Sequence, residues 1–281
     1  MGEPFVGRDV IACGRLTKSQ LETRYIRPFP GVYIDRDAEL TAAVRAKAAW
    51  LWTGRRGIVA GFSAAALHGS NWVDDRRAAE LIHNNHHCAA GIQVHRDVVE
   101  ADEVEIVAGV ATTSPTRTAL DLGCWYPKMT AVAGIDALAG ATEIKAVDVE
   151  LLARRYPGRR GIARARQATD LFDAGSQSPK ESWLRVVLVE AGLPRPQTQI
   201  QVLDEFANTV AYLDMGWEDV KVAVEYDGEQ HRNDRWQYTW DIRRREQLER
   251  RGWLLVRVVA GDRPADIVRR VRSARAGRIP G

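Results

Sequence analysis

Apolar and polar positions in the first seventy residues follow a pattern of short helices around a small strand. The four predicted elements are a helix at 16–21, a turn and strand at 29–34, a helix at 39–52 and a helix within 58–69. Thr17 precedes the first apolar position of its helix, as helix caps do. The longer helix is rich in alanine and periodic in its apolar residues. This order suggests a winged-helix module over residues 1–70.

The pattern changes after residue 70, where short apolar runs give way to helical periodicity. Strands are predicted at 80–83, 91–95 and 106–110. A helix is predicted to begin at 114–122, and further helices follow, through residue 141 and then at 147–154. Ser114 and Pro115 form a typical helix start, with a capping hydroxyl followed by proline in the first turn. Small polar residues at 173–178 then indicate a domain boundary. Residues 71–175 are therefore expected to form a middle, mixed α/β region.

The last third of the chain, residues 176–281, predicts an α/β domain. Its elements are a helix from 178, a strand at 200–203, a hairpin built around a glycine-containing turn near residue 216, a helix at 234–251, a buried central strand at 253–259 and a helix at 264–271. Ser178 and Glu181 have capping-box spacing. The whole chain is thus predicted to be an α/β (α+β) protein, with a C-terminal mixed sheet flanked by helices.

Carboxylates gather in the predicted hairpin. Glu225 and Asp227 alternate with apolar residues on one strand, so they share a face and lie roughly 6.5–7 Å apart. Asp214 ends the neighbouring strand, which allows three carboxylates to meet at one edge of the sheet. Crowded, partly buried like charges repel, and a divalent cation commonly compensates them. Hard oxygen ligands favour magnesium or manganese.

These residues also carry a family resemblance. Asp214, the apolar strand and Glu225-Tyr-Asp227-Gly-Glu-Gln-His231 resemble the core of the PD-(D/E)XK nuclease superfamily, and more narrowly the branch related to very-short-patch repair endonucleases. The continuation Asp241-x-x-Arg244-x-x-x-Leu248-x-x-x-Gly252-Trp253-x-x-x-Arg257 is similar to that branch's helix-then-strand signature. The resemblance covers residues 178 to about 275. It implies a restriction-endonuclease-like fold and metal-dependent hydrolysis of DNA phosphodiesters, in DNA repair or DNA processing.

The resemblance assigns roles to individual carboxylates. It implies that Asp214 and Glu225 bind Mg²⁺ or Mn²⁺, with the carbonyl of Tyr226 as a third ligand. Glu181 has two interpretations. It caps its helix, or it reaches the metal or its bound water, and the two roles are compatible.

One position departs from the superfamily pattern. Asp227 stands where the superfamily has a lysine that stabilises charge on the phosphate or orients water. Asp227 can bind metal or act as a base, but it cannot supply a positive charge. Lys221 and His231 are the candidates to replace the lysine, and His231 is favoured because the very-short-patch branch also carries histidine there. The alternative is a turn histidine that hydrogen-bonds a carbonyl.

The helix after the hairpin is predicted to bind DNA. Guanidinium groups bind phosphates through paired hydrogen bonds, and aromatic rings stack on bases. The predicted contacts are Arg235, Trp236, Arg243, Arg244 and Arg245. The alternative is that the aromatic residues pack on the sheet while the arginines are solvated or paired with Glu246 and Glu249.

The N-terminal half resembles a second family. Leu16-Thr-x-x-Gln-Leu21, Gly31-Val-Tyr33 and Ser63-Ala-Ala-x-Leu-His-Gly69 are similar to the AbiEi family of antitoxin-type regulators, and Ser114-x-x-Arg117-Thr-x-x-Asp121-Leu122 extends the similarity. This resemblance implies a module that contacts DNA or protein, and the alternative is a packing domain without DNA contact. It leaves open an alternative function, a DNA-binding antitoxin-like transcriptional regulator whose nuclease fold is inactive, or a repair subunit that cleaves only with a partner. The implied partners are DNA and another protein of a repair or toxin–antitoxin system.

Two further clusters have both a functional and a structural interpretation. His83-Asn-Asn-His86-His87-Cys88 contains zinc-binding residue types, but it lacks a second, well-spaced ligand pair and is better explained as a polar loop. The arginines between 154 and 166 could follow a phosphate backbone, or they could form a solvated loop and helix face.

Composition narrows these possibilities. The net charge of the 281 residues is only +3, so attraction to nucleic acid must come from local basic patches. Three scattered cysteines argue against a disulfide framework. No apolar run approaches membrane-spanning length, and the first residues lack a signal-peptide pattern. A cytoplasmic protein without a membrane partner is expected.

Overall fold

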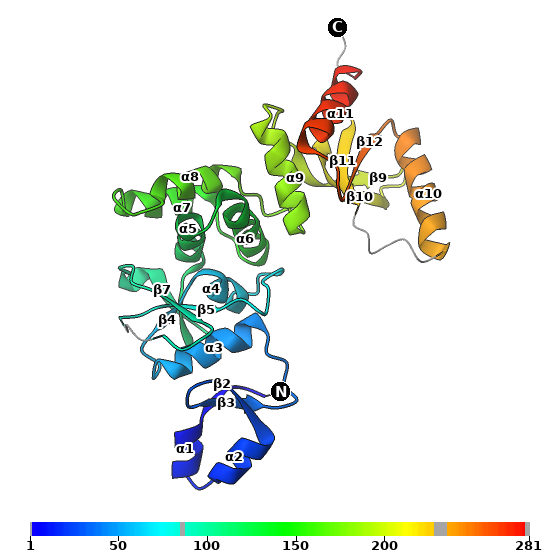
Figure 1. Cartoon of the computed structure of the whole chain (residues 1–281). Coiled ribbons are helices and arrows are strands. Elements are labelled where there is room, and N and C mark those ends of the chain that lie inside the picture. Colours follow the sequence, from blue (N-terminus) through cyan, green and yellow to red (C-terminus); the bar gives the residue numbers. More distant parts are fainter. Residues whose placement is uncertain (1, 85–87, 228–234, 279–281) are drawn as a thin grey trace. The chain divides into compact units, whose positions relative to one another are not determined.

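The computed structural model divides the chain into two compact units, Met1–Phe172 and Asp173–Gly281 (Figure 1). It describes residues 2–84, 88–227 and 235–278, with only the helix backbone for 235–242. The division at Phe172 lies close to the boundary predicted at residue 175. Each unit has its own core and is described separately.

The first unit begins with a three-stranded antiparallel sheet in the order β1-β3-β2. Its elements are β1 (Phe5–Val6), α1 (Gly7–Ala12), α2 (Lys18–Arg24), β2 (Tyr25–Phe29) and β3 (Val32–Asp35). The predicted cap of α2 is confirmed. Gln20 N donates to Thr17 Oγ1 (3.3 Å), and Thr17 N donates to Gln20 Oε1 (2.8 Å). The helix predicted at 16–21 and the strand predicted at 29–34 correspond to α2 and β3, whereas β1, α1 and β2 were not predicted, and the winged-helix assignment stays a prediction.

A five-stranded sheet in the order β6-β5-β4-β8-β7 forms the middle of the first unit. Its elements are α3 (Ala42–Trp52), β4 (Ile58–Val59), α4 (Gly61–Leu67), β5 (Ala79–Ile82), β6 (Ile92–His95), a 3-10 turn at Ala101–Glu103, β7 (Val104–Val107) and β8 (Val110–Thr113). Phe29 and Leu51 share one buried core with Leu81 and Val110. Residues before and after position 70 therefore belong to one compact unit.

Helices complete the first unit. They are α5 (Pro115–Trp125), α6 (Lys128–Ala141), α7 (Ala146–Arg155) and α8 (Ile162–Leu171). Ser114 Oγ accepts from Arg117 N (3.3 Å), which confirms the predicted helix start. Gly123 lets α5 approach α8 closely, because a Cβ at this position would lie 2.7 Å from Ala165 Cα.

The second unit contains one four-stranded sheet, in the order β12-β11-β10-β9. Its elements are α9 (Pro179–Glu190), β9 (Gln197–Leu203), β10 (Thr209–Trp217), β11 (Val222–Asp227), α10 (Arg235–Arg250), β12 (Leu254–Val259) and α11 (Pro264–Ala276). The first three strands are antiparallel neighbours, and β12 runs parallel to β11. With the sheets of the first unit, this confirms the predicted mixed α/β class.

Two local predictions in the second unit are wrong. The hairpin turn does not contain Gly216, since β10 continues through Gly216 to Trp217. Glycine is required there by close strand contact, because a Cβ would lie 2.5 Å from Val222 O. The strand predicted to be central and buried, β12, lies at the edge of the sheet, and of its residues only Val258 is buried.

Each face of this sheet has its own core. Leu188 of α9 and Ile267 of α11 pack with Val224, whereas Leu248 of α10 packs with Leu213 and with Ala223, the residue before Val224. Because neighbouring residues of a strand point to opposite faces, α10 covers the face opposite α9 and α11 (Figure 1).

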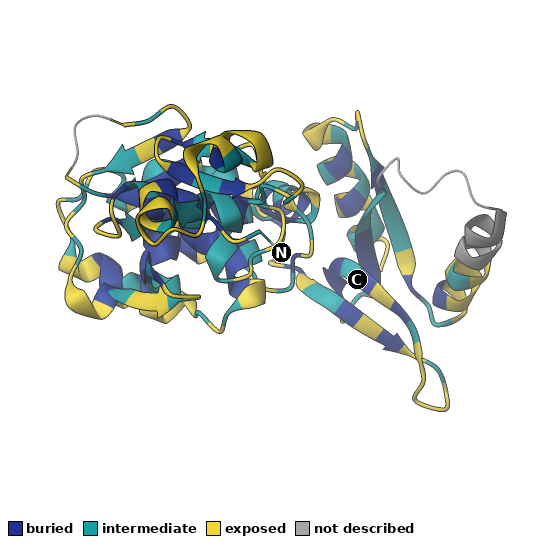
Figure 2. Cartoon of the chain, turned by 90° about the horizontal axis from the view of Figure 1, so that it is seen from below, coloured by how far each residue is buried: buried dark blue, intermediate teal, exposed yellow. Residues whose placement is uncertain are grey.

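Burial changes along β11. Figure 2 shows the chain coloured by burial. In β11, Val222, Ala223 and Val224 are fully buried, whereas Glu225, Tyr226 and Asp227 are half-buried. The carboxyl end of the strand therefore extends beyond the core, and its polar residues are partly accessible to solvent.

The core of the second unit provides a test of this architecture. Leu188→Ala should lower the free energy of unfolding of this unit by about 2–5 kcal/mol, because a fully buried leucine leaves a cavity. Leu203→Ala is the matched control, since Leu203 is 44% exposed, and it should change stability by less than about 1 kcal/mol. Denaturant titration of the full chain, followed by tryptophan fluorescence, measures both. Equal losses would contradict this core.

Candidate functional site

Three carboxylates from three elements meet where β10 and β11 lie against α9. Asp214 belongs to β10, Glu225 to β11 and Glu181 to the first turn of α9. The register that pairs Met215 with Val224 continues to a position where Asp214 lies opposite Glu225. Directly opposed residues of antiparallel strands have Cβ atoms about 4.5–5.5 Å apart. Two of the three predicted hairpin carboxylates are thus neighbours.

Asp214 is the most perturbed carboxyl group of this cluster. Burial, and after it the nearby charges of Glu181 and Glu225, raise its pKa from 3.8 to about 7. Two interactions oppose this rise. The backbone N–H of Tyr226 donates to Asp214 Oδ2 (3.0 Å), and the positive charge of Arg244 also favours the ionised form. Near neutral pH the group is therefore balanced between its protonated and ionised forms.

Glu225 is paired with Arg244 of α10. Arg244 Nη1 donates to Glu225 Oε2 (3.0 Å), and Arg244 Nη2 donates to Glu225 Oε1. The same Nη2 also donates to the carbonyl of Tyr212 (2.9 Å). The two charged side chains are 13% and 12% exposed, so this pair is shielded from solvent far more than a surface ion pair. Arg244 was expected to contact DNA, but here it contacts a carboxylate.

Glu181 lies at the start of α9, and its predicted contact with a metal ion or bound water stays a prediction. Its N–H donates to Ser178 Oγ (3.2 Å), which confirms the helix cap, and its Oε2 accepts from Gln177 N (2.9 Å). The charge of Glu181 also raises the pKa of Asp214. The carboxylate that helps to begin α9 is therefore part of the electrostatic environment of Asp214.

The other predicted ligands lie further along β11 or beyond it. Asp227 and Tyr226 are half-buried and pair with Val259 and Val258 of the parallel strand. His231 lies outside the described residues, as do the side chains of Arg235 and Trp236. Lys221 does not lie near the carboxylates. It precedes β11, and its Nζ donates to the carbonyl of Arg251 (2.8 Å).

The arginines next to Arg244 face solvent. Arg243 and Arg245 are exposed, and Arg245 Nε donates to Glu249 Oε1 at 3.0 Å. Arg250 lies 3.9 Å from Glu246. The triplet predicted to bind DNA is thus divided, with Arg244 directed to the carboxylates and its neighbours directed away from them.

The donor chemistry of the cluster fits a hard divalent cation. Asp214, Glu225 and Glu181 offer oxygen ligands, and the pKa of Asp214 is raised by burial and then by the charges of the other two. Within residues 2–84, 88–227 and 235–278, however, no three histidine, cysteine, aspartate or glutamate side chains are already arranged around one metal position. The carboxylate of Glu225 is directed to Arg244 instead.

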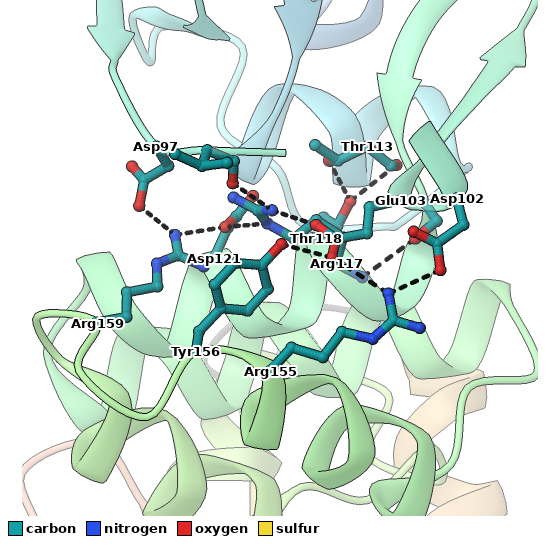
Figure 3. A network of polar contacts seen from close by, with 12 residues as sticks. Asp97, Asp102, Glu103, Thr113, Arg117, Thr118, Asp121, Arg155, Tyr156 and Arg159 are labelled. Carbon is teal, nitrogen blue, oxygen red and sulfur yellow. Dashed lines mark hydrogen bonds and ion pairs between the residues drawn. The ribbon is translucent and has the colours of Figure 1, made fainter. Parts of the chain in front are cut away.

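A second polar cluster, in the first unit, was not predicted from the sequence as a site. Figure 3 shows Arg117 inside this cluster, where its side chain is completely buried. Arg117 Nε donates to Asp121 Oδ1 (2.8 Å), Nη1 donates to the carbonyl of Val98 (2.9 Å), and Nη1 also pairs with Glu103. The four-residue spacing of Arg117 and Asp121 is the signal that the sequence contained.

The arginine stretch at 154–166 contributes to this second cluster. Arg159 Nη2 lies 2.6 Å from Asp121 and 2.8 Å from Asp97, and Arg155 pairs with Asp102 at 2.7 Å. Arg154 and Arg166 both pair with Glu150. The expectation of a purely solvated face is therefore wrong for Arg159, whose carboxylate partners hold the loop before α8 against α5.

The histidine segment has no described metal site. His86 and His87 lie outside the described residues. His95 stacks on Trp125, with ring centroids 3.4 Å apart, and its Nε2 lies 3.1 Å from Glu80 Oε1. These contacts give His95 a structural role in the first unit.

Comparison with known proteins gives a similarity over nearly the whole chain. Uncharacterized protein Rv2248 of Mycobacterium tuberculosis (strain ATCC 25618 / H37Rv) and uncharacterized protein MT2308 of strain CDC 1551 / Oshkosh are each 26% identical to this chain over 271 residues. The alignments cover 94% of this chain and 96% of each relative, so both units are included. No family model matches the chain, and no solved structure matches it. None of the described helices is long and apolar enough to cross a membrane.

The pKa of Asp214 predicts a pH-dependent stability. A folded-state pKa raised from 3.8 to about 7 means that the folded protein binds a proton more strongly than the unfolded chain, so stability falls as pH rises from about 4 to about 7. Asp214→Asn removes this penalty. It should raise the melting temperature at pH 8 relative to the wild type, with little change at pH 4.5. Melting curves across this range, without metal, measure the effect, and a constant difference would contradict the raised pKa.

The buried arginine cluster provides another test. Arg117→Met should destabilise the first unit by about 3–5 kcal/mol, because Asp121 and Glu103 would remain buried without their cation. Arg154→Met is the control. Arg154 is 69% exposed beside Glu150, and an exposed pair contributes about 0–1 kcal/mol. Denaturation of both variants distinguishes a structural network from a surface feature, and similar losses would contradict the former.

Proposed function

We propose that this protein is a metal-dependent DNA endonuclease that hydrolyses phosphodiester bonds in DNA repair or processing. The observation that carries the proposal is the position of Asp214 within β10, where burial and then the charges of Glu181 and Glu225 raise its pKa to about 7. Strongly perturbed carboxyl groups are concentrated at functional sites, because their environment destabilises the folded protein unless a ligand compensates it.

The order of elements in the second unit supports the proposal. The sequence predicts a helix with Glu181, a strand, a hairpin that carries Asp214 and Glu225, and a helix followed by a strand. Helix α9, strands β9 to β11, helix α10 and strand β12 have this order. Asp214 and Glu225 lie on β10 and β11, as the resemblance implies.

The residues have distinct proposed roles. Asp214 and Glu225 would hold Mg²⁺ or Mn²⁺, with the Tyr226 carbonyl as a further ligand, and Glu181 would position the attacking water. When bound, such an ion polarises the phosphate and lowers the pKa of water. Asp227 or His231 would transfer protons, as would suit a carboxylate or an imidazole at neutral pH.

DNA would be held by positive side chains of α10. Arg243 and Arg245 are exposed on this helix, and Arg235 and Trp236 belong to its first turn. The net charge of +3 makes such a local patch more important than the overall field. A cytoplasmic location, DNA as the partner and a second protein of a repair or toxin–antitoxin system belong to the same proposal.

One contact favours a second candidate function. Both oxygens of Glu225 accept hydrogen bonds from Arg244, and this guanidinium neutralises the negative charge that would attract a metal ion. This contact suits a DNA-binding, antitoxin-like regulator in which the nuclease fold no longer cleaves. The AbiEi-like motifs of the first unit agree with that function.

Cleavage assays distinguish the two candidates. The full chain is incubated with labelled single-stranded, duplex, mismatched and flap DNA, with Mg²⁺, Mn²⁺ or EDTA. The endonuclease should cut at least one substrate only with metal, and Asp214→Ala and Glu225→Ala should each lower the rate by about 10³-fold or more while DNA binding is retained. DNA binding without cleavage by the wild type would favour the regulator. Equal cleavage by the Asp214 variant would assign the activity elsewhere.

A further inference from the structure

In the Arg244–Glu225 pair, the guanidinium of Arg244 holds the carboxylate to which a metal ion would also bind. Each oxygen of Glu225 accepts from a different guanidinium nitrogen of Arg244, and the two side chains are 12% and 13% exposed. A metal ion at Glu225 would need at least one of these oxygens. It would also place a double positive charge beside the guanidinium, and at partly buried positions such repulsion is only weakly screened.

The guanidinium has a second partner that does not depend on Glu225. Arg244 Nη2 donates to the carbonyl of Tyr212 at 2.9 Å. One turn further along α10, Leu248 is 1% exposed and packs with Leu213 of β10. The helix backbone is therefore anchored to the sheet, and Arg244 can leave Glu225 by a change of side-chain rotamer while the main chain remains in place.

We propose that Arg244 and a divalent cation are mutually exclusive partners of Glu225. Arg244 stabilises the metal-free protein by holding this carboxylate, and the cation binds only when it displaces the guanidinium. The inference rests on the proposed function, since it concerns the ion that the endonuclease would use. It explains why a protein with suitable ligands has no preformed arrangement for metal among its described residues.

The test measures metal binding directly, by calorimetric titration of the full chain with Mn²⁺ at one pH. Arg244→Gln keeps a polar side chain but removes the charge, so it should bind Mn²⁺ about tenfold or more tightly than the wild type, because hydrogen bonds between charged groups no longer have to be broken. Arg250→Gln is the matched control. Arg250 is 77% exposed on the same helix, and its loss of charge should change the affinity less than about twofold.

A double-variant cycle makes the competition specific to Glu225. In a Glu225→Gln background, the additional change Arg244→Gln should have no effect on Mn²⁺ affinity, because the shared carboxylate is gone. Melting curves give an independent readout. Arg244→Gln should melt at a lower temperature than the wild type without metal, and Mn²⁺ should raise its melting temperature more.

The outcomes separate this inference from the proposed function. Unchanged or weaker Mn²⁺ binding by Arg244→Gln, with metal-dependent cleavage by the wild type, would overturn the competition and leave the endonuclease intact. Failure of the wild type and the variant to bind Mn²⁺ would contradict both. Binding by Arg244→Gln alone would support the competition and favour the regulator. If Arg244→Gln does not fold, Arg244→Lys serves, since lysine cannot engage both oxygens in a planar fork and should also bind Mn²⁺ more tightly.

Discussion

The repulsion between Asp214 and its neighbouring carboxylates is the constraint on which the second unit depends. Two antiparallel strands bring Asp214 and Glu225 face to face, and α9 adds Glu181. Such a group of charges is unstable unless protons, hydrogen bonds or cations compensate it. The protein shows all three forms of compensation: a raised pKa at Asp214, the Tyr226 N–H on its oxygen, and Arg244 on Glu225.

The surrounding packing prevents the charges from separating. Val222, Ala223 and Val224 are fully buried between two cores, so the strand that carries Glu225 cannot shift relative to β10. A shift of one residue would also move every side chain of β11 to the opposite face of the sheet. The strand register set by the apolar residues therefore keeps the polar site in place, and the packing of the two cores offsets the repulsion between the carboxylates.

Buried charges are arranged differently in the first unit. Around Arg117, cations and carboxylates alternate, and each charged group that is deeply buried has an opposite charge within hydrogen-bonding distance. Balanced networks of this kind position structural elements, and here they join α5 to the loop before α8. The contrast explains why the unbalanced cluster at Asp214 is the better candidate for binding a ligand.

The sequence by itself determined the features that depend on neighbouring residues. Thr17, Ser114 and Ser178 cap their helices as predicted, and alternation located β10 and β11, because caps and strand periodicity are local properties. The sequence also placed Asp214 and Glu225 together, since a hairpin joins them. Only the tertiary structure decided that Gly216 lies within a strand and that β12 is an edge strand, because both depend on which strands pair. It alone paired Glu225 with Arg244, nineteen residues later, since this contact follows from packing and not from spacing along the chain.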